Sequence, residues 1–251
     1  MSDAVANEPE SPVAWDAQGM PFSVRFGDRY RSEGQGLRGG LAQARHVFLA
    51  GCRLAAPDGQ PAADAAWRGA RCWRVLENGF GLGLNFLATW QAWRHDPHRP
   101  GMLQYDATEA WPPSAHDVRR SVQPFPDLEA QAHALADAWP SLLSHGTSVF
   151  EGGRVQLRLH LGDAVAGLSR IETGVHSIYL DGFDPRLNPG MWSADILRTI
   201  GSLAHPGAHA ATWCVARTVR DGLAYAGFKV KRREGLPPKR HCLAALRTDA
   251  A

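Results

Sequence analysis

Hydrophobic and polar positions alternate along the chain with two different periods. In residues 155–161, VQLRLHL, the apolar residues fall on every second position, with Arg154, Gln156, Arg158 and His160 between them. In residues 84–95, LNFLATWQAWRH, apolar side chains instead recur at helical spacing, for example at Leu84 and Leu87. The first pattern predicts a strand and the second predicts a helix.

From residue 72 to about residue 228, segments of the two kinds follow one another. Strands are expected within 71–80, 101–111, 154–163, 177–183 and 209–216, and helices within 84–95, 114–145, 193–204 and 218–227. Such alternation is typical of an α/β protein with a doubly wound, mostly parallel sheet, which is a Rossmann-like fold. Two further strands, within 228–235 and 240–247, predict an antiparallel C-terminal hairpin.

The same patterns predict the domain organisation. Residues 1–20 are polar and are expected to form a flexible N-terminal arm. Residues 21–251 are expected to form a single domain, with an N-terminal appendage over 21–71 and the Rossmann-like core over 72–251.

Composition narrows the class of protein. The 251 residues are 44% hydrophobic and 21% charged, which suits a folded core. No apolar run approaches the roughly 18 residues of a membrane span, and the polar N-terminus lacks a signal peptide, so a cytoplasmic protein without a membrane partner is expected. The four cysteines contain no CxxC pair, so neither a metal site nor a disulfide is expected.

Charge is unevenly distributed along the chain. The formal net charge is only +2, but residues 217–247 contain nine Lys and Arg against two acids. A basic end on a more acidic body can contact a nucleic-acid backbone, or it can be an ordinary solvated face. Charge alone leaves both interpretations open.

The segment ENGFGLGLN, residues 77–85, comes at the end of the first predicted core strand. Gly79, Gly81 and Gly83 form GxGxG, whereas the dinucleotide motif GxGxxG would need a glycine at Leu84. Glu77 before the loop disfavours a pyrophosphate and suits a cationic ligand. These features favour S-adenosyl-L-methionine, which is cationic and lacks phosphate. Asn85, at the end of the segment, is expected to bind this cofactor as well.

Two further acids come at the ends of predicted strands. Glu109 follows the second core strand and can accept hydrogen bonds from ribose hydroxyls, and Asp163 follows the third and can bind an adenine amino group. Each of these acids could also be an ordinary solvated side chain. Their order on successive strands favours the interpretation that they bind the cofactor.

The segment YLDGFDPRLNPGMW, residues 179–192, is more specific. A predicted buried strand leads to Asp181, and two prolines stiffen the loop that follows. Phe183 or Trp192 could stack on a nucleobase. Trp192 could equally be a core residue.

Three segments together, ENGFGLGLNFLATWQAW, LDGFDPRLNPGMW and GGLAQARHVFL, resemble the methyltransferase domain of the bifunctional enzymes that make 5-methylaminomethyl-2-thiouridine in tRNA. The resemblance runs from about residue 22 to residue 246. It implies a class I methyltransferase fold that uses S-adenosyl-L-methionine to methylate 5-aminomethyl-(2-thio)uridine at the wobble position, with the tRNA anticodon stem-loop as partner. The fused enzymes also have an FAD domain, and none is expected in this chain.

The resemblance also implies roles for individual residues. It assigns cofactor binding to the glycine loop, Glu109 and Asp163, and it places Asp181 beside the transferred methyl group, where it would accept a proton from the amine or hold the cofactor's ammonium. It assigns substrate contacts to the following residues: Asn188, Pro189, Trp192, Lys239 and Arg240.

The sequence departs from the family pattern at Ala42 and Gln43, where the family has paired acids, and at Asp184, where it has alanine. These departures leave two alternatives open, a methyltransferase with another small-molecule or protein substrate and a non-catalytic tRNA-binding module. For the tRNA interpretation, the residues expected to contact the anticodon stem backbone are Lys229, Lys231, Arg232, Arg233, Lys239 and Arg240.

Overall fold

A computed structural model describes residues 11–32 and 38–248. Its main feature is an eight-stranded sheet with the order β10-β11-β9-β8-β4-β5-β7-β6. The strands are β4 (Cys72–Asn78), β5 (Met102–Glu109), β6 (Thr147–Phe150), β7 (Val155–Leu161), β8 (Val175–Leu180), β9 (Ala204–Thr212), β10 (Phe228–Glu234) and β11 (His241–Arg247).

Five neighbouring strands of this sheet, β7, β5, β4, β8 and β9, are parallel. Taken in sheet order they are the third, second, first, fourth and fifth of the set in the chain, which is the Rossmann order. β10 and β11 form the antiparallel hairpin at one edge, and β6 pairs antiparallel with β7 at the other. The predicted α/β fold and terminal hairpin are confirmed, whereas β6 was not predicted.

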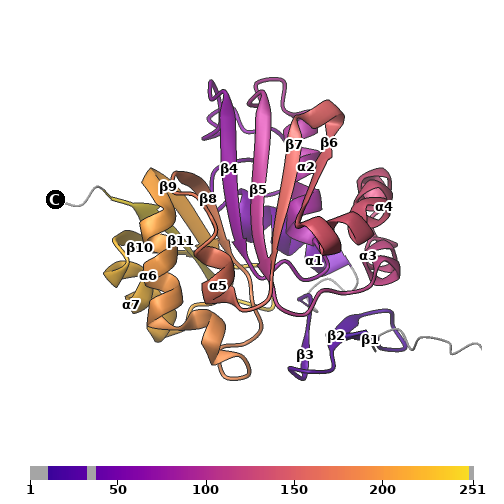
Figure 1. Cartoon of the computed structure of the whole chain (residues 1–251). Coiled ribbons are helices and arrows are strands. Elements are labelled where there is room, and N and C mark those ends of the chain that lie inside the picture. Colours follow the sequence, from indigo (N-terminus) through magenta and orange to yellow (C-terminus); the bar gives the residue numbers. More distant parts are fainter. Residues whose placement is uncertain (1–10, 33–37, 249–251) are drawn as a thin grey trace, which may run out of the picture.

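Helices cover both faces of the sheet (Figure 1). One face carries α1 (Gly39–Gln43), the π-helical turn η2 (Ala44–Leu49), α2 (Leu84–His95), α3 (Ala115–Ser121), the short η3 (Pro126–Leu128) and α4 (Glu129–His145). The other face carries α5 (Ala164–Leu168), α6 (Ala194–Leu203) and α7 (Arg217–Tyr225). Short 3-10 turns, η4 (Glu151–Gly153) and η5 (Pro189–Trp192), lie in the connections.

Local sequence accounts for where several helices begin and end. Ser193 caps α6, because its hydroxyl accepts from the backbone N–H of Ile196. Ser114 and Asp117 form a capping box at the start of α3. α4 ends at Gly146, whose positive φ of 72° favours glycine.

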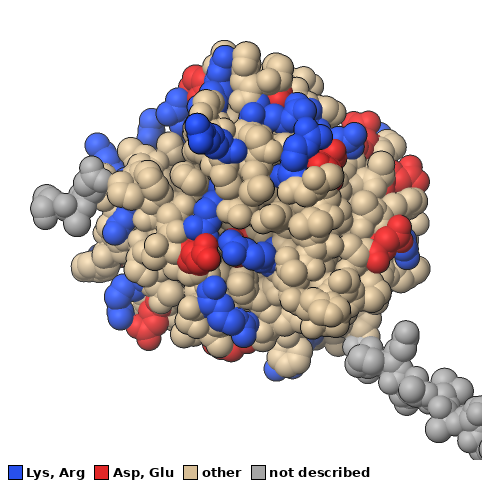
Figure 2. Space-filling view, turned by 45° about the horizontal axis from the view of Figure 1, so that its top comes forward, with Lys and Arg blue, Asp and Glu red and all other residues tan. Residues whose placement is uncertain are grey.

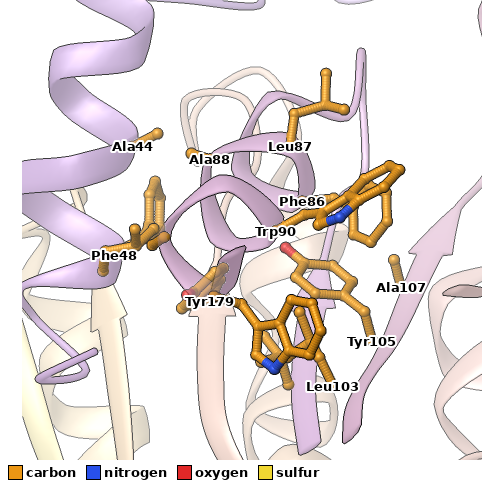
Figure 3. Close-up of a cluster of buried hydrophobic side chains, with 14 of the residues drawn as sticks. Ala44, Phe48, Phe86, Leu87, Ala88, Trp90, Leu103, Tyr105, Ala107 and Tyr179 are labelled. Carbon is orange, nitrogen blue, oxygen red and sulfur yellow. The ribbon is translucent and has the colours of Figure 1, made fainter. Parts of the chain in front are cut away.

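The core beneath the first helical layer is rich in aromatic residues. Figure 3 shows Phe48 of η2 near Tyr179 of β8, and Phe86 of α2 near Tyr105 of β5. Phe86 packs edge-on to Tyr105 with ring centroids 5.1 Å apart, and both residues are fully buried. Each such side chain stabilises the fold by ~1.5–3 kcal/mol, and this packing holds α2 and the glycine loop before it against β4 and β5.

Before the core, β1 (Val13–Trp15), β2 (Pro21–Ser23) and β3 (Asp28–Arg29) form a small antiparallel sheet. It lies below the lower edge of the large sheet in Figure 1. Part of the predicted arm, residues 1–10, lies outside the described residues, but Val13–Trp15 pair with Pro21–Ser23 in this sheet. Ordered pairing therefore begins earlier than residue 21, and the division into an appendage and a core stays a prediction.

None of the helices in the described residues has the length and apolar character that crossing a membrane requires.

Candidate active site

A cleft of about 950 Å³ lies at the carboxyl ends of β4, β5, β7 and β8. Its floor is formed by the glycine loop and by residues that directly follow β5, β7 and β8. Residues of the small N-terminal sheet and of the loop between β10 and β11 also line it. Chain order reverses between β4 and β8, and ligands of doubly wound sheets bind at this switch point.

The glycine loop lies close against other backbone. Gly79 has a φ of 100°, and a Cβ built on it would overlap the backbone oxygen of Asp181 and lie 2.9 Å from Cε of Met191. Gly81 has a φ of 54°, and a Cβ there would lie 3.3 Å from the Tyr30 ring. The loop therefore needs glycine both for its conformation and for the space it leaves free in the cleft.

Glu109 and Asp163 lie where the sequence placed them, and both line the cleft. Glu109 Oε2 accepts from the N–H of Gly81 at 2.8 Å, and Oε1 accepts from the N–H of Trp111 at 2.7 Å. Burial raises the pKa of Glu109, while these backbone donors oppose the rise. Asp163 caps α5 with Oδ1 alone, through the N–H groups of Val165 and Ala166, so Oδ2 has no part in the cap.

Asp181 is held through both of its oxygens. Oδ2 accepts from Asn85 Nδ2 at 2.8 Å, and Oδ1 accepts from Trp213 Nε1 at 3.1 Å. Burial raises the pKa of Asp181 to about 6, and Asn85, Lys239 and Trp213 limit that rise. A carboxylate fixed in this way, with a pKa close to neutral, is suited to exchange a proton with a ligand in the cleft.

Glu77 lies beneath this layer and does not line the cleft. It accepts from Asn85 Nδ2 at 2.7 Å and from the Tyr105 hydroxyl at 2.9 Å, and burial raises its pKa well above the ordinary value. The prediction of direct cofactor contact therefore needs correction. Glu77 orients Asn85, which in turn donates to Asp181.

Lys239 extends into the cleft from the loop between β10 and β11. Its Nζ lies 3.5 Å from the centroid of the Trp213 ring, in a cation–π contact. Burial lowers the pKa of Lys239, while Asp181, Asp28 and other nearby groups counteract this. Lys239 and Asp181 thus flank the same indole.

The loop that follows Asp181 is fixed from two sides. Phe183 lines the cleft and packs 4.9 Å from the ring of Phe26 and 5.2 Å from that of Tyr30, measured between centroids. The backbone N–H of Asp184 donates to Asp28 at 3.0 Å, so the N-terminal sheet holds the loop in place. Asp184, the departure from the family pattern, lines the cleft, and its side chain accepts hydrogen bonds from Arg186.

Trp192 is the clearest correction among the predicted substrate residues. It is 7% exposed, it packs in the core against α6, and its Nε1 donates to the backbone oxygen of Phe183. A buried indole cannot stack on an incoming base. Asn188 lines the cleft, but Pro189 and Arg240 are not among the residues that do.

The six basic residues expected on the tRNA surface do not share one surface. Side chains alternate along β10, so Lys229, Lys231 and Arg233 share one face of it, whereas Arg232 is on the other. Arg233 donates to the backbone of η2, and Lys239 points into the cleft. Figure 2 shows Lys and Arg scattered over its face of the molecule with acids between them, so charge density alone does not mark a docking surface.

The residues that line the cleft and were not predicted from the sequence include Trp213, Tyr30 and Arg31. Trp213 directly follows β9, so the rule that ligands bind beyond strand ends could have found it. Tyr30 and Arg31 follow β3 in the appendage, and nothing in their local sequence indicates the cleft.

The residues at the cleft fit S-adenosyl-L-methionine. The bare glycine backbone leaves space that a Cβ would occupy, and Glu109 and Asp163 present carboxylate oxygens suited to ribose hydroxyls and an adenine amino group. No group of three or more His, Cys, Asp or Glu in the described part of the chain could hold a metal ion. The four cysteines are free thiols.

Comparison with known proteins agrees with this geometry. The family model described as S-adenosyl-L-methionine-dependent methyltransferase matches residues 126–248. A crystal structure of MNMC2 from Aquifex aeolicus matches with a TM-score of 0.69 at 21% identity, over 96% of this chain and 71% of that chain, which supports the fold. Fold, cleft and family match together define the chain as an S-adenosyl-L-methionine-dependent methyltransferase.

Within this class, the chain resembles the tRNA 5-methylaminomethyl-2-thiouridine biosynthesis bifunctional proteins MnmC. It is 50% identical to that of Delftia acidovorans over 94% of this chain, and 48% identical to that of Paracidovorax citrulli over 93%. The chain spans 35% of the length of each of these two relatives. The similarity therefore concerns one part of a longer protein.

Proposed function

We propose that this methyltransferase transfers a methyl group to the primary amine of 5-aminomethyl-(2-thio)uridine at the wobble position of tRNA. The observation that carries the proposal is the Asp181 carboxylate, which is held by Asn85 and Trp213 at the switch point of the sheet. The 48–50% identity to the tRNA 5-methylaminomethyl-2-thiouridine biosynthesis proteins of Delftia acidovorans and Paracidovorax citrulli supports this substrate.

The proposed chemistry demands little beyond positioning and a proton acceptor. S-adenosyl-L-methionine supplies an electrophilic methyl group when bound. Asp181 orients the substrate amine and accepts its proton, and the two donors on its oxygens keep the carboxylate in one orientation. Glu109 and Asp163 hold the adenosine part of the cofactor.

Lys239 offsets the negative charge around Asp181. Asp28 and Asp184 also lie near Lys239, so its positive charge opposes three carboxylates at the substrate side of the cleft. This charge favours the ionised form of Asp181, which is the form that can take a proton from the amine.

The test is to incubate the protein with labelled S-adenosyl-L-methionine and tRNA that carries 5-aminomethyl-wobble uridine, and then to identify the labelled nucleoside. We expect label on 5-methylaminomethyl-(2-thio)uridine and none on tRNA whose wobble uridine is unmodified. If the protein binds the cofactor but no tRNA is labelled, the proposed substrate is wrong, and a small-molecule or protein methyl acceptor is favoured. Tight tRNA binding without cofactor binding would favour a non-catalytic module.

The anticodon stem-loop is the proposed partner, and Lys229 and Lys231, which are exposed on one face of β10, are the proposed backbone contacts. The cytoplasmic location predicted from the sequence agrees with such a substrate and stays a prediction.

A further inference from the structure

The side chain of Asn85 is fixed between two carboxylates beside the cleft. Asn85 is the second residue of α2, it is 6% exposed and it lines the cleft. Its Nδ2 donates to Glu77 Oε1 at 2.7 Å and to Asp181 Oδ2 at 2.8 Å. An asparagine amide nitrogen carries two hydrogens, so both are used. Reversal of the amide would set its oxygen against the Asp181 carboxylate, and this determines the orientation of the side chain.

The amide oxygen of Asn85 is an acceptor that the protein leaves open. Among the described residues no donor bonds to Oδ1, yet this oxygen is not one of the fully buried side-chain atoms that lack a partner. It therefore retains access to the cleft that Asn85 lines. The backbone of Asn85 is held separately, because the Thr89 hydroxyl donates to its carbonyl oxygen at 2.7 Å. A fixed and open acceptor suits a ligand that donates N–H groups.

The open oxygen of Asn85 lies close to the Asp181 carboxylate. Because the oxygen and nitrogen of an amide are bonded to one carbon, Asn85 Oδ1 lies at most about 5 Å from Asp181 Oδ2. Two acceptors that each bond to one hydrogen of the same tetrahedral nitrogen lie about 4.7 Å apart. Asn85 and Asp181 can thus accept from two N–H groups of one amine.

We propose that Asn85 Oδ1 and Asp181 hold the two N–H groups of the substrate amine, and that Asn85 thereby limits the reaction to one methyl group. This inference rests on the proposed function. When both N–H groups face these acceptors, the lone pair of the tetrahedral nitrogen has one direction left, and the amine is oriented for attack. The nitrogen gains one N–C bond, the S–C bond of the sulfonium breaks with its electron pair left on sulfur, and the surplus proton goes to Asp181.

The product amine has lost one of these two hydrogens. To react again, its lone pair would have to point in the same direction, which would place the new methyl group against Asn85 Oδ1 or against Asp181. A methyl group donates no hydrogen bond, so one acceptor would lose its partner. A second methylation is therefore disfavoured, and Asn85 is a specificity-determining residue.

The first test measures binding by calorimetry in the presence of S-adenosyl-L-homocysteine, which is unreactive. The ligands are anticodon stem-loops whose wobble uridine carries a 5-aminomethyl, a 5-methylaminomethyl or a 5-dimethylaminomethyl group. As cations the first two keep at least two N–H groups, whereas the third keeps one. For the unmodified protein we expect similar Kd values for the first two and a Kd at least about tenfold higher for the third, because one charge-assisted hydrogen bond is lost. In Asn85→Ala this difference should shrink to less than about threefold.

The second test identifies the nucleosides by mass spectrometry after prolonged incubation with tRNA and S-adenosyl-L-methionine. Asn85→Ala should raise the dimethylaminomethyl fraction at least about tenfold above that of the unmodified protein, even where its turnover is lower. Thr89→Val is the matched control, because Thr89 contacts the backbone of Asn85 and is not among the residues that line the cleft. It should leave both the binding difference and the product ratio unchanged.

Equal binding of the three stem-loops by the unmodified protein would overturn the proposal, as would a dimethylated fraction in Asn85→Ala no higher than in Thr89→Val. S-adenosyl-L-homocysteine should bind Asn85→Ala within about threefold of the unmodified protein, and a loss of about tenfold or more would assign the Asn85 oxygen to the ammonium group of the cofactor instead. If Asn85→Ala does not fold, Asn85→Ser and the stem-loop series in the unmodified protein decide.

Failure of this inference can be told apart from failure of the proposed function. If the unmodified protein transfers no methyl group to the tRNA, the proposed function is wrong and this role of Asn85 falls with it. If it methylates the tRNA but binds the three stem-loops equally, the proposed function stands and only the role of Asn85 is removed.

Discussion

The part of the cleft around Gly79, Glu109 and Asp163, the cofactor side, is built from residues at or just beyond the carboxyl ends of three neighbouring parallel strands. The part around Asp181, the substrate side, also draws on Trp213 after β9, on Lys239 from the hairpin loop and on Phe26 of the N-terminal sheet. A site of the first kind needs only the sheet to form. A site of the second kind forms only when four segments that are distant in the chain pack together. A substitution in any of these segments can therefore change the shape of the substrate side.

The comparison teaches where specificity can vary. The cofactor side relies largely on backbone groups and on acids at strand ends, which any class I methyltransferase sheet can present. The substrate side holds one carboxylate between an amide and an indole, beneath a cation. We therefore expect substitutions on the two sides to affect different measurable quantities.

The largest expected effect is that of Asp181→Asn. It removes the proposed proton acceptor, so kcat for tRNA methylation should fall by about 10²–10⁴-fold, the usual contribution of a general base. Binding of S-adenosyl-L-homocysteine should change far less. The control is Asp195→Asn, an exposed acid on α6 that pairs with Arg198. Near-normal turnover in Asp181→Asn would remove Asp181 from the mechanism.

The next effect should come from Gly79→Ala on the cofactor side. The added Cβ would overlap the backbone oxygen of Asp181 at a positive φ, so we expect a loss of stability of ~1–3 kcal/mol together with weaker S-adenosyl-L-homocysteine binding. Thermal unfolding and calorimetry measure the two. Gly207→Ala is the matched control, because Gly207 has a φ of 80° with nothing within 4 Å of its Cβ position. If both variants bind the ligand equally well, the close approach at Gly79 is not needed for binding.

A moderate effect is expected from Lys239→Met, and it should appear in the pH dependence. Asp181 must be ionised to accept a proton, so with its pKa raised to about 6 turnover should decline as the pH falls through that value. Lys239 opposes the rise in this pKa, so its removal should raise the pKa further and move the acidic limb of the kcat profile to higher pH. Lys231→Met, on the exposed face of β10, should leave the limb in place. If the acidic limb of Lys239→Met stays at the pH of the unmodified protein, Lys239 does not influence the pKa of Asp181.

The smallest effect is expected outside the cleft, from Lys229→Gln combined with Lys231→Gln. If both residues bind phosphates of the anticodon stem, the slope of log Kd against log salt should become shallower by about 0.7–0.9 for each lysine replaced. Filter binding over a range of salt concentrations measures it, with the exposed Arg198→Gln on α6 as the control. If the slope of the double variant equals that of the unmodified protein, Lys229 and Lys231 do not contact the tRNA backbone.

Some features of the fold could be predicted because their cause is local. The period of two in residues 155–161 and the helical spacing in 84–95 reflect which side chains face the core, and they recur as β7 and α2. The same holds for Glu109, Asp163 and Asp181, because alternating strands and helices place their carboxyl ends at one edge of a parallel sheet.

The interpretation of Trp192 shows where local reasoning stops. An aromatic residue in a stiff loop has the same sequence pattern whether it faces solvent or the core. Only the packing of the η5 turn on α6 buried this one. Trp213, which follows β9, lines the cleft and was not predicted to do so.

The sequence by itself thus determined the alternating α/β architecture, the glycine loop and the acids at the strand ends, since each depends on neighbours in the chain. Only the tertiary structure decided that Glu77 is buried behind Asn85, that Lys239 lies over Trp213 and that Arg31 donates to the backbone oxygen of Ser121. These contacts join residues from different elements, such as Arg31 and Ser121, which are 90 positions apart. Because such contacts arise from the docking of whole elements, no local pattern of residues encodes them.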